Sequence, residues 1–359
     1  MERKTLIIVG IAAVAIVLIA LAAVVVLNNH GDDGPKELTV TDSRNRTVTV
    51  PGDLERILPL NSCSLELVSY FDSLNKVVAL DSNDQITGNK TYTMVNKSFL
   101  EGLPKVDGSS YEAIIATSAQ LIITSTIDAG QLDDLQSKTS IPVFAINADL
   151  EFGDEAWFDQ IKNLGKVLGE EKRGKEIADG VKDLISKITS KKVDGVKGYT
   201  CGMMFYGKGT FLKTSGDWLP FAYSGVENVM PSSTAGVGKQ PYNTTIEQVM
   251  AKDFGYIFVD NSNKAAVIDE MKGYISDQGL SNDAIKNGDV YGVLTYKQWG
   301  TQFDAVLIDC LYVAKTVNPG AYSWDFVSEA DKVLNLLYGS GFTYSDMVKN
   351  QDACGKIAL

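Results

Sequence analysis

The strongest constraint on the fold is an alternation of short apolar runs with amphipathic helical segments, which occurs in both halves of the chain. The runs predicted to be strands are residues 56–60, 76–80, 121–124 and 142–146 in the first half, and 199–205, 256–259 and 290–293 in the second. Strands that alternate with helices form parallel sheets with helices on both faces. We therefore predict an α/β protein with two lobes, each built on a parallel-rich sheet flanked by helices.

Helical spacing of apolar residues predicts the intervening helices. They are residues 64–74, 111–116 and 132–137 in the first half, and residues 218–224, 245–251, 265–278, 303–317 and 324–338 in the second. Before them, residues 37–50 alternate apolar and polar side chains around a turn at residues 42–45, which predicts a small β-hairpin.

A long helical stretch lies between the two halves. Residues 157–168 and 175–188 carry apolar side chains at helical spacing, and Gly169 is predicted to mark a break between them. The predicted division is a first lobe at residues 37–150, a linking helix at 151–192 and a second lobe at 193–359.

The N-terminal segment predicts a membrane anchor. Residues 5–27 are apolar or small and carry no charge, which is long enough for a helix to span ~30 Å of hydrocarbon. Arg3 and Lys4 precede this run, and positive charge keeps that end in the cytoplasm. A cleaved secretory signal is the alternative, although its apolar core is usually only ~7–15 residues long. Both interpretations place residues 37–359 outside the membrane, and we expect residues 1–36 to be an uncleaved signal anchor and tether of a single-pass cell-membrane protein.

Charge and residue counts exclude several classes of protein. The formal net charge of −12 disfavours nucleic acid as a partner. The one histidine, His30, lies just after the hydrophobic segment, so neither lobe has a histidine for acid–base catalysis or metal binding. The four cysteines are far apart and form no C-x-x-C pair, which argues against zinc and iron–sulfur sites. We predict that the protein is not an enzyme and has no resident metal or cofactor.

N-x-[ST] triplets begin at Asn45, Asn89, Asn96 and Asn243. Such triplets are acceptors for N-glycosylation in a protein exposed outside the cell. The chain is thus predicted to be a glycoprotein if its host modifies surface proteins.

Ligands of open parallel sheets bind beyond the carboxyl ends of the strands, so the loops that follow strands are the candidate site. In the first lobe these loops supply Asn61, Ser62, Cys63, Ser82, Ser125 and Thr126. In the second lobe they supply the aromatic residues Tyr206, Trp218, Tyr242, Tyr296 and Trp299, with Lys213, Lys239 and Lys297 nearby. Polar side chains there can donate to a ligand, and aromatic side chains can hold a large planar one. The alternatives are helix capping for the polar residues and lobe packing for the aromatic ones.

Glu112 and Glu247 occupy matching places in the two halves. Each begins a helix, and an apolar strand starts nine residues later in both cases. The helix dipole favours a carboxylate at such a position, which is a sufficient structural reason for either residue. Their symmetric placement predicts a second role, as one acidic contact per lobe for a partner with two subunits.

Several segments carry a resemblance to a known family. They are residues 40–51, with the sequence VTDSRNRTVTVP, the following Glu55-Arg56-Ile57, and residues 110–124, 223–229, 245–259 and 287–293. In these segments the chain resembles the class III periplasmic-type solute-binding proteins of ABC importers, which bind ferric siderophores, haem or cobalamin. The resemblance implies two α/β lobes joined by one long helix, with a fairly rigid hinge. It also implies delivery of the ligand to a permease with a cytoplasmic ATPase, and docking of Glu112 and Glu247 onto permease arginines.

We therefore expect the substrate-binding component of an ABC importer, which captures an iron(III)-siderophore, a corrinoid or a similar metal chelate between its lobes. The zinc and manganese branch of this superfamily uses histidine ligands, which the lobes lack. Siderophore binders often carry arginines in the cleft, and no such set is evident in the sequence, so a neutral chelate such as cobalamin stays open. Two alternatives keep the same fold: a surface sensor or adhesin that no longer transports, and a chelatase-like enzyme.

Overall fold

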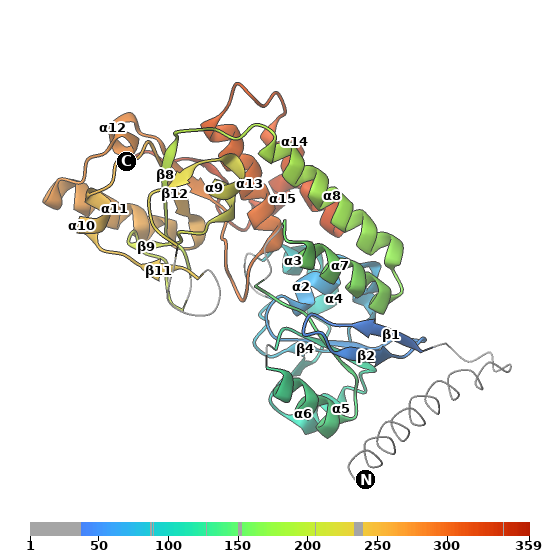
Figure 1. Ribbon diagram of the computed structural model, residues 1–359. Coiled ribbons are helices and arrows are strands. Elements are labelled where there is room, and N and C mark those ends of the chain that lie inside the picture. Colours follow the sequence, from blue (N-terminus) through green and yellow to red (C-terminus); the bar gives the residue numbers. More distant parts are fainter. Residues whose placement is uncertain are drawn as a thin grey trace, which may run out of the picture. The chain divides into compact units, whose positions relative to one another are not determined.

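The computed structural model describes residues 37–86, 88, 90–126, 128–149, 153–204, 206–232, 240–339 and 341–359 (Figure 1). Within these ranges, no helix is both long enough and apolar enough to cross a membrane. The predicted membrane segment at residues 5–27, the tether, Asn89 and Lys239 lie outside the described residues. Of the other glycosylation triplets, Asn45 and Asn243 are exposed and Asn96 is half-buried.

The first sheet is built on parallel strands in the order β3 (Ile57–Leu60), β6 (Leu121–Thr124) and β7 (Val143–Ala145). Every residue of these strands is buried, as expected for parallel strands between layers of helices. The short parallel strands β4 (Leu80–Asp81) and β5 (Lys105–Val106) lie beside β3. The predicted parallel arrangement of the first lobe is therefore confirmed.

The predicted hairpin is present as β1 (Leu38–Thr41) and β2 (Thr47–Val50), which pair antiparallel. Valines point into the core and the alternate threonines are exposed, because successive side chains of a strand face opposite ways. The turn of this hairpin is attached to the end of β7, where the Ser43 amide donates to the Ala145 carbonyl at 3.0 Å. The hairpin thus reaches the carboxyl edge of the first sheet.

The second sheet has the order β10-β8-β12-β13-β14. Its strands are β8 (Lys197–Cys201), β10 (Glu227–Asn228), β12 (Tyr256–Asp260), β13 (Val290–Val293) and β14 (Gly355–Lys356). All neighbours are parallel except β13 and β14, which the C-terminal segment adds as an antiparallel edge. A separate antiparallel pair joins β9 (Lys213–Thr214) to β11 (Tyr242–Asn243).

Several predicted elements are shorter in the structure. The strand predicted for residues 199–205 ends at Cys201, because Gly202 turns the chain with φ +78° and donates its amide to the Thr210 carbonyl. The helix predicted for residues 64–74 is observed as α2 (Ser64–Ser69), followed by the 3-10 helix η1 (Asp72–Lys76). Because η1 extends to Lys76, only the end of the strand predicted at residues 76–80 is a strand, and it forms part of β4.

The remaining helices flank the two sheets. In the first half they are α3 (Thr91–Val95), α4 (Lys97–Leu100), α5 (Tyr111–Ala116) and α6 (Ala129–Thr139). In the second half they are α9 (Leu219–Ser224), α10 (Ile246–Met250), η2 (Asn261–Asn263), α11 (Lys264–Gln278), α12 (Asp283–Asn287), α13 (Phe303–Val317), α14 (Phe326–Tyr338) and α15 (Tyr344–Met347).

The segment at residues 151–192 holds two helices, α7 (Glu155–Leu168) and α8 (Glu171–Thr189), which meet at Gly169. Gly169 ends α7 with φ +76°, a left-handed conformation that glycine adopts without strain. α7 packs on α8 and on the hairpin, whereas the 19-residue α8 continues to β8 and packs on α13 and α14 (Figure 1). A single helix, α8, therefore leads from the first sheet to the second.

Buried polar contacts hold the two halves together beside α8. Arg173 donates through Nε to the Tyr70 carbonyl at 2.9 Å and through Nη2 to the Leu336 and Leu337 carbonyls at 2.6 and 3.0 Å. The Glu66 carboxylate, on α2, accepts from the Phe303 amide at the start of α13 at 2.9 Å. Burial raises the pKa of Glu66 well above its ordinary value, and the nearby Asp304 raises it further.

Candidate functional site

The carboxyl ends of β3 and β6 carry a cluster of polar side chains. Asn61 donates through Nδ2 to the hydroxyls of Thr124 and Thr126 at 2.9 and 3.0 Å, and the two hydroxyls are 3.1 Å apart. Ser62 and Ser125 lie next to this group, with their hydroxyl oxygens 3.4 Å apart. The structure thus brings together four of the predicted site residues, which come from segments more than sixty positions apart.

These side chains do not cap helices. Cys63 occupies the position before α2 and makes no side-chain cap bond, and α6 is capped by Asp128 instead. Asn61 and Cys63 have φ values of 65° and 63°, in the left-handed region that costs a non-glycine residue ~1–3 kcal/mol. The turn between β3 and α2 therefore holds its polar groups in a strained conformation, with Asn61 exposed.

Asp81, at the end of β4, fixes this turn from the side. Its Oδ2 accepts from the Asn61 amide at 2.8 Å, and its Oδ1 accepts from the Asn83 amide at 2.9 Å. Ser82 follows directly and is exposed, with its own amide bonded to the Val106 carbonyl at 2.8 Å. Sequence reasoning missed Asp81, although an acidic residue that ends a short apolar strand is a usable signal.

A loop of the second half reaches this turn. The Cys63 thiol donates to the Thr301 carbonyl at 3.6 Å. Gly300 lies so close that a Cβ built on it would be 2.4 Å from the Cys63 sulfur and 3.1 Å from the Ser62 Cβ. The loop after β13 is therefore in contact with the polar cluster of the first sheet.

The same loop carries a cation, Lys297, which contacts the amide side chain of another segment. Lys297 donates through Nζ to Gln240 Oε1 at 2.9 Å, and Gln240 donates through Nε2 to Asp149 Oδ1 at 3.5 Å. Asp149 lies on the loop that follows β7, so this chain of contacts again joins the two sheets. Burial raises the pKa of the Cys63 thiol, and the charges of Lys297 and Asp149 act on it in opposite directions.

The aromatic residues predicted for the site lie in different environments. Trp218 is 1% exposed and packs its ring on Phe221 and Phe258, so the structure places it in the core and not among the strand-end side chains. Tyr242 donates its hydroxyl to the Pro231 carbonyl at 2.6 Å. Tyr206 is 94% exposed.

Tyr296 and Trp299 lie on the loop that contacts the first sheet. Tyr296 is buried and Trp299 is 37% exposed with φ 57°. Lys213 is buried on β9, and burial lowers its pKa. Among the described residues, no group of three or more His, Cys, Asp or Glu side chains could hold a metal ion.

Asp260, at the end of β12, positions the loop that carries Tyr296. Its Oδ2 accepts from the Tyr296 amide and its Oδ1 from the Ser262 amide, both at 2.8 Å. Burial raises the pKa of Asp260 to about 6 from an ordinary value of 3.8. Like Asp81, Asp260 is an acidic residue that ends an apolar strand, and sequence reasoning missed it.

The raised pKa makes the stability of the protein depend on pH. Between pH 3.8 and about 6 the folded chain keeps the Asp260 proton that the unfolded chain loses. The contribution of Asp260 is therefore full below pH 3.8 and is lost as pH rises through about 6, for a total of about 3 kcal/mol. We expect Asp260→Asn to remove this component, which urea unfolding of both proteins at pH 4, 5, 6 and 7.5 measures. A difference between the two proteins that stays constant across this range contradicts the assignment.

Glu112 and Glu247 are both exposed in the first turn of a short helix, on α5 and α10. Each is followed three positions later by an exposed large apolar residue, Ile115 at 48% and Met250 at 43% exposure. Positions three apart lie on the same face of a helix. Each half thus presents a carboxylate beside an apolar side chain.

Comparison with known proteins identifies the fold as one that other solute-binding proteins share. The profile of the family described as "Periplasmic binding protein" matches residues 69–294. The molybdate-binding protein MolA of Haemophilus influenzae is 23% identical over 329 residues, which cover 83% of this chain and 89% of MolA. A periplasmic solute-binding protein of Veillonella parvula superposes with a TM-score of 0.68 at 16% identity, over 88% of this chain and 97% of that one. Helicobacter pylori CeuE with Ni(II) bound superposes with a TM-score of 0.63 at 16% identity, over 87% and 99% of the two chains.

Proposed function

The chain belongs to the periplasmic binding protein family, and from this premise we propose that it captures a metal chelate or a metal oxyanion and delivers it to the permease of an ABC importer. The ligand lies at the carboxyl edge of the first sheet, where the loop after β13 meets the Asn61–Thr126 cluster. An iron(III)-siderophore and a corrinoid are candidate chelates. The relative MolA, whose name gives molybdate as its ligand, adds a metal oxyanion to the candidates.

One observation carries this proposal: side chains from both sheets converge on one place. Asn61, Ser62 and Thr126 offer hydroxyl and amide groups from the first sheet. The loop after β13, which carries Lys297, contacts Ser62 and Cys63 through Gly300 and Thr301. Such groups recognise the oxygen atoms of a ligand, whereas a bare metal ion requires carboxylate, imidazole or thiolate ligands. Neither lobe contains a histidine. A metal that arrives already surrounded by oxygen therefore suits this site better than a free ion.

Replacement of Asn61 by alanine is expected to weaken ligand binding by about tenfold or more, because Thr124 and Thr126 lose the shared donor that holds their hydroxyls in place. The measurement is a calorimetric titration of the full-length chain with molybdate, haem, cyanocobalamin, a ferric hydroxamate and a ferric catecholate. Asn287→Ala, at an exposed position on α12, is the matched control and is expected to leave affinity unchanged. The proposal fails if no probe binds the wild type below ~10 μM, about −7 kcal/mol.

Docking to the permease completes the proposed function. We assign this role to Glu112 with Ile115 on α5 and to Glu247 with Met250 on α10, one pair in each half. A two-subunit permease can contact both pairs at once through basic and apolar side chains. We further propose that residues 5–27 hold the protein at the membrane, where the permease lies.

A further inference from the structure

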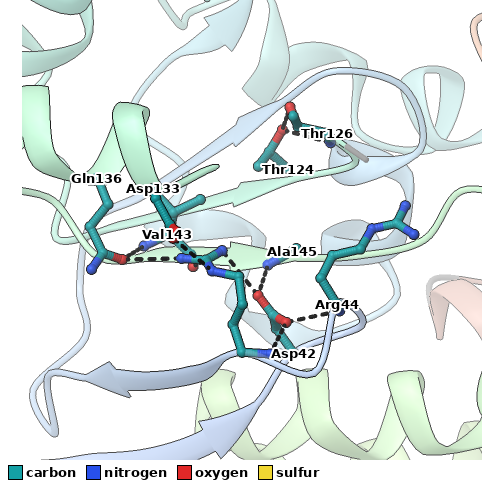
Figure 2. A network of polar contacts seen from close by, with 9 residues as sticks. Asp42, Arg44, Thr124, Thr126, Asp133, Gln136, Val143 and Ala145 are labelled. Atoms are coloured by element: carbon teal, nitrogen blue, oxygen red, sulfur yellow. Dashed lines mark hydrogen bonds and ion pairs between the residues drawn. The ribbon is translucent and has the colours of Figure 1, made fainter. Parts of the chain in front are cut away.

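The turn between β1 and β2 holds Asn45, the acceptor of one glycosylation triplet, in a fixed conformation. The Asn45 amide donates to the Asp42 carbonyl at 3.1 Å, and its φ of 59° is a left-handed conformation that asparagine tolerates better than most residues. Asp42 Oδ1 accepts from the amides of Arg44 and Arg46, both at 2.9 Å. Its Oδ2 accepts from the Ala145 amide at 3.3 Å, and Figure 2 shows this carboxylate between the turn and the end of β7. Asn45 therefore lies on a turn whose backbone has one defined position.

Both functional groups of this triplet are accessible in the folded protein. Asn45 and Thr47 are exposed, and Thr47 begins β2, opposite Thr41 across the hairpin. In the part of the chain that the structure describes, the side chains of Asn45 and Thr47 make no hydrogen bond. A glycosyltransferase has to reach the asparagine amide and the hydroxyl two positions later. The triplet at Asn45 can therefore be modified without any loss of structure.

The other two triplets within the described ranges have engaged groups. Asn96 is half-buried, and its Nδ2 donates to the Tyr92 carbonyl at 2.9 Å. Asn243 is exposed, but the Thr245 hydroxyl of its triplet caps α10 and accepts from the Gln248 amide at 3.3 Å. Modification at either place would require these contacts to break. Of the three, Asn45 is the acceptor that the fold leaves available.

Asn45 also lines a groove between the hairpin, the end of β7 and α7, with a volume of about 270 Å³. This volume is below the ~300–1,000 Å³ of pockets that enclose a drug-sized ligand, and it suits a single sugar ring. The groove presents one exposed methyl group and several partly or fully exposed polar side chains, which are Ala156, Thr41, Asn147, Asp159 and Asn163. Carboxylate, amide and hydroxyl groups hydrogen-bond to sugar hydroxyls, and a methyl group packs on the apolar face of the ring.

We propose that Asn45 carries an N-linked glycan and that the first sugar of this glycan lies in the groove. The chain belongs to the periplasmic binding protein family, whose members work outside the cytoplasm, where N-glycans are attached. The inference goes beyond ligand capture and is independent of it, because none of the groove residues belongs to the Asn61–Thr126 cluster. The sugar adds hydrogen bonds between the hairpin and α7 and thereby stabilises the first lobe.

The modification needs a co-reactant, which is an oligosaccharide joined through phosphate to a membrane polyprenol. Asn45 Nδ2 attacks the anomeric carbon of the first sugar, and a carbon–nitrogen bond forms as the bond between that carbon and the phosphate oxygen breaks. The polyprenyl phosphate leaves with the electron pair, and one Nδ2 proton passes to a base of the transferase. No oxidant or reductant takes part.

The first test is mass spectrometry of the full-length protein purified from its native host. Cleavage after glutamate releases residues 38–55 as one peptide, in which Asn45 begins the single triplet. We expect this peptide to carry the mass of a glycan. Thr47→Ala is expected to abolish the added mass and Thr47→Ser to retain it, because serine preserves the triplet. An unmodified peptide from the wild type overturns the proposal, whether or not the other triplets are modified.

Thermal unfolding tests the place of the sugar. Asn45→Gln, which lacks the glycan, is expected to unfold roughly 2 °C below the glycosylated wild type. Asn163→Ala is expected to lower the midpoint of the glycosylated protein by roughly 1–2 °C more than it lowers that of Asn45→Gln, because only the first has a sugar that contacts Asn163. The control Asn335→Ala, at an exposed position on α14, is expected to shift both midpoints equally. An equal effect of Asn163→Ala in both proteins overturns the groove as the place of the sugar.

Discussion

Reversal of charge at both Glu112 and Glu247 to lysine is expected to reduce import by ~100-fold or more while ligand affinity remains within ~2-fold of wild type. In the proposed docking, each substitution replaces an attraction to permease arginines by a repulsion, and the two act at separate contacts. Both side chains are exposed and lie outside the polar cluster, so neither the fold nor the site depends on them. The measurement is uptake in proteoliposomes that hold the permease and its ATPase, paired with a binding titration.

The matched control reverses two other exposed glutamates, Glu101 and Glu227, one in each half. Import by the control is expected to equal that of wild type, which separates local docking from the change in net charge. Ile115→Ser with Met250→Ser is expected to give an intermediate loss, since it removes apolar contact and keeps both carboxylates. Full import by the double glutamate variant contradicts the docking assignment and leaves the capture function intact.

Gly300→Val is expected to lower the stability of the protein by about 2–5 kcal/mol and to abolish ligand binding. A side chain at Gly300 meets the Cys63 sulfur, and φ +102° is unfavourable for any residue with a Cβ. The loop after β13 must then move away from the Asn61–Cys63 turn, which separates the two halves of the site. Thermal unfolding and ligand titration of the same preparation measure the two effects.

Gly320→Val is the control for this substitution, because a Cβ at Gly320 meets nothing within 4 Å. A double variant, Gly300→Ala with Cys63→Ala, isolates the steric part of the loss of stability. The double variant is expected to be destabilised by about 1 kcal/mol or more less than the two single variants together, because the alanine at position 63 leaves room for the new Cβ. Strict additivity of the two substitutions contradicts the close contact between the loop and the turn.

Strongly patterned segments of the fold were predictable from the sequence. The strands Leu121–Thr124 and Val290–Val293 and the helix Phe303–Val317 have the predicted bounds, because their apolar content is continuous or strictly periodic. The two-residue strands β9, β11 and β14 were not predicted. Their pairing depends on partners far along the chain and leaves no local pattern.

Those parts of the candidate site that the topology of the parallel sheets determines were predictable from the sequence. The clustering of Asn61, Ser62, Ser125 and Thr126 was predictable because parallel strands end at a common edge. The contact made by Gly300 was not predictable, since it depends on the approach of a distant loop. Trp218 shows the converse error: its position after a strand suggested a ligand contact, but its ring fills the core beside Phe258.

The contact between Glu66 and Phe303 has a consequence for how the chain folds. The first amide of a helix has no partner within that helix, and Gln302 provides no side-chain cap for α13. The missing acceptor is the Glu66 carboxylate, which belongs to a helix 237 positions earlier in the chain. The Phe303 amide at the start of α13 therefore gains this hydrogen bond only when α2 and α13 have come together, which couples the two halves of the fold.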